Sequence, residues 1–168
     1  MRYLLIALLT LPLLTRCADD RTAAEQQDGT STTTNYREFL PGTWEKIGLR
    51  VEVNSFNNQD STFTVQVREE DWAKTTQSLP TLTYFLLDNK YRQEFRALNG
   101  DTLFVSRGMW NIFGDTLILV EPDTSYQFLL SVNESSNLEM RRQIDWDGDG
   151  LEDDDYLEIH RRISRSAQ

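Results

Sequence analysis

The sequence of 168 residues has very few of the side chains that carry covalent or acid–base chemistry, with a single cysteine, Cys17, and a single histidine, His160. One cysteine cannot form a disulfide within the chain. Neither a Gly-x-Ser-x-Gly nor a His-Glu-x-x-His motif occurs. His160 lies on the polar side of the last apolar alternation, so we expect its side chain to be exposed. The sequence therefore predicts no catalytic residues and a protein that is not an enzyme.

Positive charge is also scarce, because 17 Lys and Arg residues stand against 27 Asp and Glu residues, for a formal net charge of −10. An acidic surface repels phosphate backbones, which argues against a nucleic-acid partner. Long apolar runs are absent except near the N-terminus, where Arg2 precedes the apolar run 3–14. That run is shorter than the ~20 residues that span a bilayer and has the length of a signal-peptide core.

The segment Leu14-Thr15-Arg16-Cys17 resembles the lipobox of bacterial lipoproteins. The resemblance implies a signal peptide over residues 1–16, lipidation of Cys17 and a membrane anchor, and Ala18-Asp19-Asp20 is similar to a signal for the Gram-negative outer membrane. Arg16 stands where a small residue is usual, so a secreted or periplasmic protein is the alternative. Residues 17–40 begin with a polar stretch without apolar periodicity and predict a flexible tether.

Residues 41–168 have the length of one domain, and their apolar positions alternate with a period of two. Short turn sequences rich in Asn, Gly and Asp separate the alternating segments, as expected for antiparallel hairpins. The exception is a segment that can form a helical turn, 69–74. The pattern predicts nine strands, near 47–53, 63–67, 81–87, 91–98, 102–112, 116–120, 125–132, 137–144 and 156–163.

An antiparallel meander of eight or nine strands hides its edges by closing into a barrel or by folding into a sandwich, and sequential hairpins favour the barrel. The sequence thus predicts an all-β, up-and-down barrel. A bulky set of side chains is expected to point inward, and it either fills the interior or lines a small cavity. This set is Phe63, Phe85, Phe95, Tyr126 and Phe128.

Gly42-Thr43-Trp44 resembles the Gly-x-Trp that opens the first strand of lipocalins and of bacterial lipocalin-like lipoproteins, and the segment 108–119 is similar to a late hairpin of these proteins. The resemblance implies a lipocalin-like barrel for a small, largely apolar ligand, with Trp44 at the barrel floor against an arginine of the last strand. Arg161 shares its parity with the apolar residues there and is the expected partner. Trp44 and Val51 have opposite parity, which predicts a bulge near residues 46–48.

The segment 145–153 has the pattern D-x-D-x-D-G-x-x-D, which offers oxygen ligands at the spacing that calcium uses. The expected ligands are the carboxylates of Asp145, Asp147, Asp149 and Asp153 and the carbonyl of Leu151. Strands are predicted on both sides, so the loop is similar to the calcium loops of integrin-type propellers and not to an EF-hand. We expect a structural calcium ion; the alternative is a solvated acidic loop.

The sequence thus favours an envelope-anchored, non-enzymatic barrel that binds a small, largely apolar ligand. The alternative is a solid barrel that acts as an interaction or assembly subunit for a protein or glycan of the cell envelope. In that alternative, Trp72 is exposed and forms a contact patch together with the segment 69–80.

Overall fold

The structure is a computed structural model that describes residues 34–56, 59 and 61–165. The predicted signal peptide, residues 1–16, and Cys17 lie outside these residues. Within the described part of the chain, no helix has the length and apolar character needed to cross a membrane. The elements are α1 (Tyr36–Phe39), β1 (Gly42–Val53), β2 (Phe63–Val67), η2 (Glu69–Asp71), α2 (Trp72–Thr76), β3 (Ser78–Phe85), β4 (Lys90–Ala97), β5 (Thr102–Phe113), β6 (Thr116–Val120), β7 (Ser125–Val132), β8 (Leu138–Ile144) and β9 (Asp154–Ser164).

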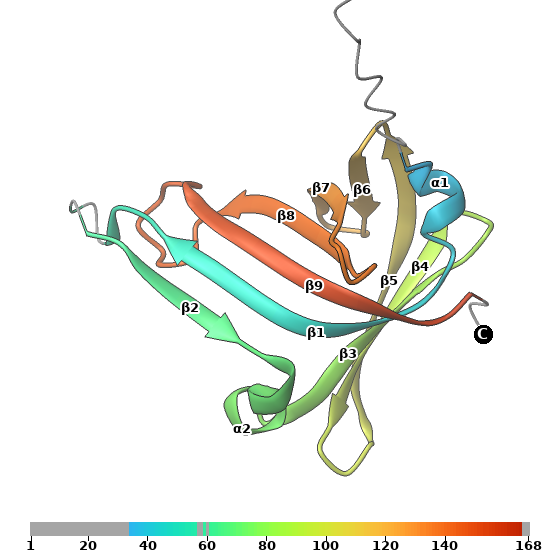
Figure 1. Ribbon diagram of the computed structural model, residues 1–168, viewed down its shortest axis with the longest axis horizontal. Helices are drawn as coiled ribbons and strands as arrows, with labels where there is room; N and C mark the ends of the chain where they lie inside the picture. Colours follow the sequence, from blue (N-terminus) through green and yellow to red (C-terminus); the bar gives the residue numbers. More distant parts are fainter. Residues whose placement is uncertain (1–33, 57–58, 60, 166–168) are drawn as a thin grey trace, which may run out of the picture. The chain divides into compact units, whose positions relative to one another are not determined.

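The strands form one antiparallel sheet in the order β2-β1-β3-β4-β5-β6-β7-β8-β9, and β1 also pairs with β9. This pairing closes the sheet into a barrel of eight strands (Figure 1), which are β1 and the seven strands from β3 through β9. Strand β2 is an extra strand outside the barrel. The predicted all-β antiparallel barrel is confirmed. The pairing of β1 with β9 removes the edges that these two strands would expose in an open meander.

Strand β1 has two different neighbours on one of its sides. Its first residues, 42–45, pair with β3, and its last residues, 49–53, pair with β2. Of the nine predicted strands, β2 is thus the one outside the barrel wall, and the short helices η2 and α2 carry the chain from β2 to β3 (Figure 1). Phe63 of β2 was expected to point into the barrel, but its side chain is 44% exposed, so this expectation is wrong.

A bulge interrupts the long pairing of β1 with β9. Lys46 lies opposite His160 and Gly48 lies opposite Ile159, so one residue of β1, Ile47, has no partner. An extra residue reverses the parity of the strand beyond it. The predicted bulge at residues 46–48 is confirmed, and it is the reason that Trp44 and Val51 are both fully buried.

The apolar core occupies one part of the barrel and includes residues of α1. The hydroxyl of Tyr36 donates a hydrogen bond to the carbonyl of Leu130 at 3.2 Å, and Leu40 is completely buried. Residues 34–40 thus belong to the folded domain, and the expected tether does not extend to residue 40. The buried cluster consists of Tyr36, Leu40, Trp44, Phe85, Tyr91, Trp110, Ile112, Leu117, Leu119, Phe128, Leu130, Leu138 and Met140.

Candidate functional site

The floor of the barrel is built by Trp44 and Arg162. The Arg162 guanidinium lies 4.2 Å from the ring centroid of Trp44 and donates hydrogen bonds to the carbonyls of Phe39 and Pro41. The indole N–H of Trp44 donates to the carbonyl of Leu40 at 2.8 Å. The resemblance of Gly42-Thr43-Trp44 to the lipocalin motif implied a contact between Trp44 and an arginine of the last strand, and such a contact is present.

The expected partner of Trp44, Arg161, is wrong by one position. Arg161 lies on the outer face of β9, where it forms ion pairs with Glu45 at 2.7 Å and Glu69 at 2.9 Å. The prediction failed because it assumed that the apolar residues of β9 face inward, whereas the inward residues of this strand are polar or charged. Trp44 lies directly opposite Arg162 in the pairing of β1 with β9.

Above the floor, the barrel contains a cavity of about 320 Å³. This volume lies at the lower end of the range found for small-molecule sites. Its wall combines aromatic, hydroxyl and charged side chains, which come from strands far apart in the sequence. The lining residues are Lys46, Tyr91, Gln93, Phe95, Phe104, Ser106, Leu119, Glu121, Tyr126, Phe128, Arg142, Tyr156 and Glu158.

A buried polar cluster on β1 and β9 forms one side of this cavity. The Lys46 ammonium forms an ion pair with Glu158, the hydroxyl of Tyr156 donates to the same carboxylate, and His160 Nε2 lies 2.8 Å from it. His160 is only 1% exposed, so the expectation of an exposed histidine is wrong. Burial alone raises the pKa of Glu158, but the charge of Lys46 and the hydrogen bonds outweigh burial and hold this pKa well below its usual range.

A second carboxylate, Glu121, lines the cavity from the end of β6. It accepts hydrogen bonds from the Tyr91 hydroxyl at 2.7 Å and from the hydroxyl of Ser106. Burial and the nearby Glu121 raise the pKa of the Tyr91 phenol well above its usual value. Tyr91 therefore stays neutral at any physiological pH and donates a hydrogen bond to Glu121.

Arg142 of β8 extends toward the same cavity among three aromatic rings. The distances from its guanidinium carbon to the ring centroids are 5.0 Å for Tyr126, 5.3 Å for Phe128 and 5.4 Å for Tyr156. Contacts of this length are cation–π interactions. They hold the guanidinium in place but use none of its N–H donors.

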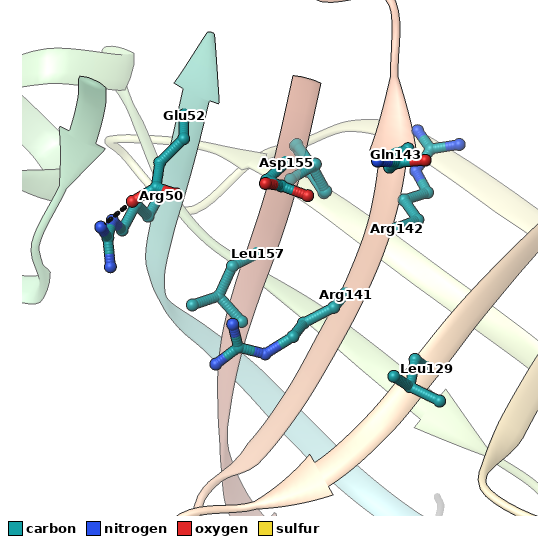
Figure 2. Close-up of a pocket in the computed structure, with 9 residues that line it drawn as sticks. Arg50, Glu52, Leu129, Arg141, Arg142, Gln143, Asp155 and Leu157 are labelled. Carbon is teal, nitrogen blue, oxygen red and sulfur yellow. Dashed lines mark hydrogen bonds and ion pairs between the residues drawn. The ribbon is translucent and has the colours of Figure 1, made fainter. Parts of the chain in front are cut away.

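The neighbouring residue, Arg141, lies on the outer face of β8 and differs from Arg142 in having a carboxylate partner. Its side chain extends toward Leu157 of β9 (Figure 2) and forms an ion pair with Glu139 at 2.8 Å. A groove of about 350 Å³ lies here, and Arg142 and Tyr156 line it together with Arg141. The groove contains further outward residues, including the exposed ion pair of Arg50 and Glu52.

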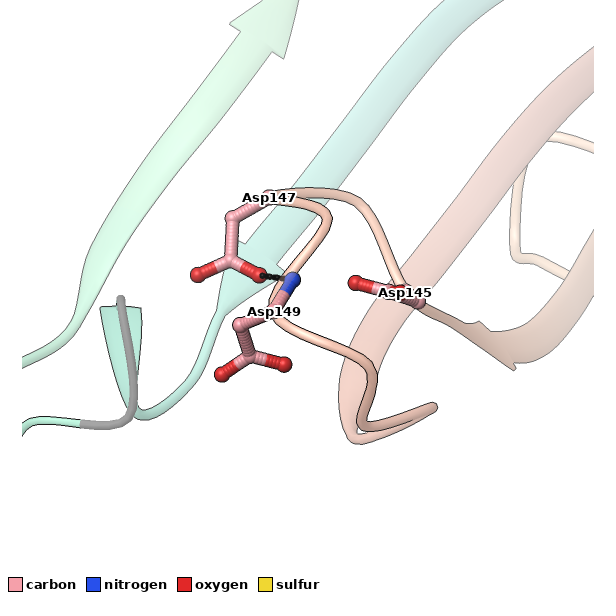
Figure 3. A group of neighbouring side chains, drawn as sticks. All are labelled: Asp145, Asp147 and Asp149. Atoms are coloured by element: carbon pink, nitrogen blue, oxygen red, sulfur yellow. Dashed lines mark hydrogen bonds between the residues drawn. The ribbon is translucent and has the colours of Figure 1, made fainter.

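The aspartate loop connects β8 to β9 (Figure 3). The carboxylates of Asp145, Asp147 and Asp149 each offer an oxygen, and these oxygens all lie within 4.8 Å of one another. Gly150, at the sixth position of the motif, has φ +93° and donates its N–H to Asp145 at 3.1 Å. The positive φ explains the glycine at this position. Three of the predicted ligands are thus close enough to hold a metal ion.

The end of the loop is held by hydrogen bonds to the two residues that follow β1, Asn54 and Ser55. Asp153, also a predicted ligand, accepts a hydrogen bond from the hydroxyl of Ser55 at 2.6 Å. The neighbouring Asp154 is fully buried, and its carboxylate accepts the N–H groups of Asn54 at 2.8 Å and Trp146 at 2.6 Å. Sequence reasoning missed Asp154, because nothing in an acidic run distinguishes a buried carboxylate from its exposed neighbours.

Trp72 is 5% exposed, so it cannot form the contact patch that the interaction alternative predicted. It begins α2, the helix that leads into β3. Sequence spacing alone gave no indication of whether this ring would be buried or exposed.

No family model matches the sequence, and no curated protein matches it. A proposal for its function therefore depends on the geometry of the barrel and of the aspartate loop.

Proposed function

We propose that this protein is a non-enzymatic binding protein that holds a small molecule inside its barrel. The observation that carries the proposal is the cavity above the Trp44–Arg162 floor, whose wall contains several aromatic rings together with a few charged and hydrogen-bonding groups. A site with this mixture binds the body of a ligand through apolar contacts and fixes its orientation through a few polar groups. The ligand is therefore small and has a largely apolar body.

The aromatic side chains favour this kind of ligand. Phe95 and Phe104 lie with ring centroids 5.6 Å apart at the cavity, on the paired strands β4 and β5. Phe104 is 60% exposed, and an apolar ligand body that covers it removes this surface from water. Burial of apolar surface gives ~25 cal/mol per Å².

We further propose that the domain is attached to the outer membrane through lipidated Cys17 and that calcium orders the loop between β8 and β9. The first part is supported by the lipobox-like segment 14–17. The second is supported by the three converging aspartates and by the loop contacts to Asn54 and Ser55. Calcium takes six to eight oxygen ligands, and Asp153 and the Leu151 carbonyl are the further candidates.

Titration with N-phenyl-1-naphthylamine, a neutral probe that fluoresces in apolar surroundings, tests the proposed function. We expect saturable binding with one site per protein. Ser106→Trp fills the cavity from β5 and should abolish binding, whereas Arg107→Trp, whose side chain is exposed on the same strand and does not line the cavity, should leave it unchanged. Gln93→Trp repeats the test from β4 if the first variant does not fold.

Two results would contradict the proposal. One is the absence of saturable binding to the wild-type protein. The other is equal binding by the wild type and by a folded variant whose cavity is filled, because the probe would then lie on the outer surface.

A further inference from the structure

The barrel wall is open on one side, between β7 and β8. These strands pair over four positions only, from Leu129 opposite Arg141 to Val132 opposite Leu138. The residues of β7 before this pairing, 125–128, and the last residues of β8, 142–144, have partners on their other sides but not across this gap. A cleft of about 700 Å³ lies here.

The gap leads to the internal cavity. Three side chains line both spaces, namely Tyr126, Phe128 and Arg142. They are the two rings and the guanidinium that contact one another. Arg142 is therefore placed where the inside of the barrel meets the opening in its wall.

Arg142 differs in its partners from the arginines around it. Arg50, Arg141 and Arg161 each have a carboxylate within ion-pair distance, and Arg162 donates to two carbonyls. In the described part of the chain, no carboxylate lies within ion-pair distance of Arg142.

The Nε of Arg142 is buried and has no hydrogen-bond partner among the described residues. A guanidinium always carries its charge and has five N–H donors. Burial of an N–H donor without a partner is unfavourable. The aromatic rings compensate for part of the charge, but they leave the donors for a group that comes from outside the chain.

We propose that Arg142 binds the anionic group of an amphiphilic ligand at the gap between β7 and β8, while the apolar body of that ligand occupies the cavity. This inference depends on the proposed function and adds the chemical class of the ligand. An oxyanion such as a carboxylate accepts two parallel N–H groups of a guanidinium, which a neutral alcohol does not.

Within the cavity, the other charges favour Arg142 as the partner of the anion, although Asp145 and Glu152 also line the cleft. Lys46 already pairs with Glu158, so its charge is compensated within the chain. Glu121 accepts its hydrogen bonds at the end of β6 and repels an anion placed beside it. Arg142 is the lining cation that these carboxylates leave uncompensated, and it lies at the opening, where the anionic group stays close to water.

Competition between the neutral naphthylamine probe and two ligands of equal chain length, decanoate and decan-1-ol, tests the proposal. At neutral pH, we expect decanoate to displace the probe from the wild-type protein at about a tenfold lower concentration than decan-1-ol. Arg142→Gln should reduce this ratio to about one, because the apolar contacts remain and the ion pair is lost. The matched control is Arg161→Gln on the outer face of β9, which lines neither the cleft nor the cavity and should keep the wild-type ratio.

Tyr126→Glu is a second test that keeps Arg142. It places a carboxylate where a ring now lies 5.0 Å from the guanidinium, and it should abolish the preference for decanoate by internal competition. Equal displacement by both ligands in the wild type overturns the proposal, as does a preference that persists in folded Arg142→Gln and Tyr126→Glu. In both cases the probe still binds, so the proposed function stands. A wild-type protein that does not bind the probe contradicts the proposed function itself.

Discussion

Replacement of Lys46 by methionine tests whether the polar cluster inside the barrel is a compensated charge network. Methionine keeps the apolar stem of lysine but removes the ammonium, so Glu158 would remain as a buried carboxylate, with 7% of its side chain exposed, without a cationic partner. Removal of one partner of a buried ion pair costs ~3–5 kcal/mol. Because His160 and Tyr156 still contact the carboxylate, we expect a loss near the lower limit, about 3 kcal/mol.

The loss should depend on pH. In the wild type, the folded-state pKa of Glu158 lies below its unfolded value, so its ionised form stabilises the fold at neutral pH, and this contribution is lost as the pH falls through the folded-state pKa. Without Lys46, burial raises the pKa of Glu158, and the carboxyl group takes up a proton during folding at a higher pH. The difference between the wild type and Lys46→Met should therefore narrow on acidification.

Urea unfolding of the wild type and of Lys46→Met gives their difference in unfolding free energy, and it is measured at about pH 7.5 and at about pH 4.5. The matched control is Arg50→Met on the same strand, because the ion pair of Arg50 with Glu52 is exposed and its loss should cost less than about 1 kcal/mol at either pH. A cost for Lys46→Met that is as small as the control, or that is the same at both pH values, would refute the reasoning.

Three further predictions concern the floor, the loop and the anchor. Arg162→Met should destabilise the domain by about 2–3 kcal/mol in urea unfolding, because two carbonyls and Trp44 lose their partner, whereas Arg161→Met should cost about 0.5 kcal/mol. Calcium should raise the melting temperature by about 4 °C or more, and the double variant Asp147→Asn, Asp149→Asn should lose this rise; a melting curve that a chelator does not change would contradict the calcium site. Cys17→Ala should move the protein from the membrane fraction to the soluble fraction, and continued sedimentation with membranes would show another mode of attachment.

The strands of the barrel could be predicted because hydrophobic alternation and turn residues are local signals. The predicted bounds of β6 and β7, 116–120 and 125–132, are the observed ones, since a short turn sequence delimits each of them. The bulge in β1 could also be predicted from a local signal. Trp44 and Val51 are both apolar and should both face the interior, but their positions have opposite parity in a regular strand. Closure followed from the absence of any long crossover between the strands.

The position of β2 could not be predicted from such signals. Its alternation is normal for a strand, but its partner is only the second half of β1, and η2 and α2 then return the chain to the first half. Helix α1 was missed because four residues give no measurable periodicity. Tyr36 and Leu40 are fixed by contacts with Leu130 and Trp44, which lie on other elements.

The two candidate sites differ in how far the sequence could locate them. The aspartate loop is a single continuous segment, so its spacing alone brought Asp145, Asp147 and Asp149 together in advance. The residues that line the cavity lie on β1, on each of the strands from β4 through β9 and directly after β6. Its geometry depends on the barrel register, which no local pattern contains.

The last strand shows why alternation identifies a period but not a face. Its apolar residues, Leu157 and Ile159, lie opposite the outward positions Arg50 and Gly48, whereas the residues that alternate with them face the interior. A barrel with a dry interior would show the reverse arrangement. Polar residues inside are stable only when their groups are paired.

The charged groups among the inward residues of β8 and β9 are paired except at Arg142, and His160 Nδ1 is a buried neutral atom without a hydrogen-bond partner among the described residues. Glu158 has a cation and two further hydrogen-bonding partners, and Arg162 has two carbonyls and the Trp44 ring. Arg142 has rings but, among the described residues, no anion. In a network that otherwise satisfies its own charges, a lone guanidinium beside a gap in the wall is best explained by a partner that the chain does not supply.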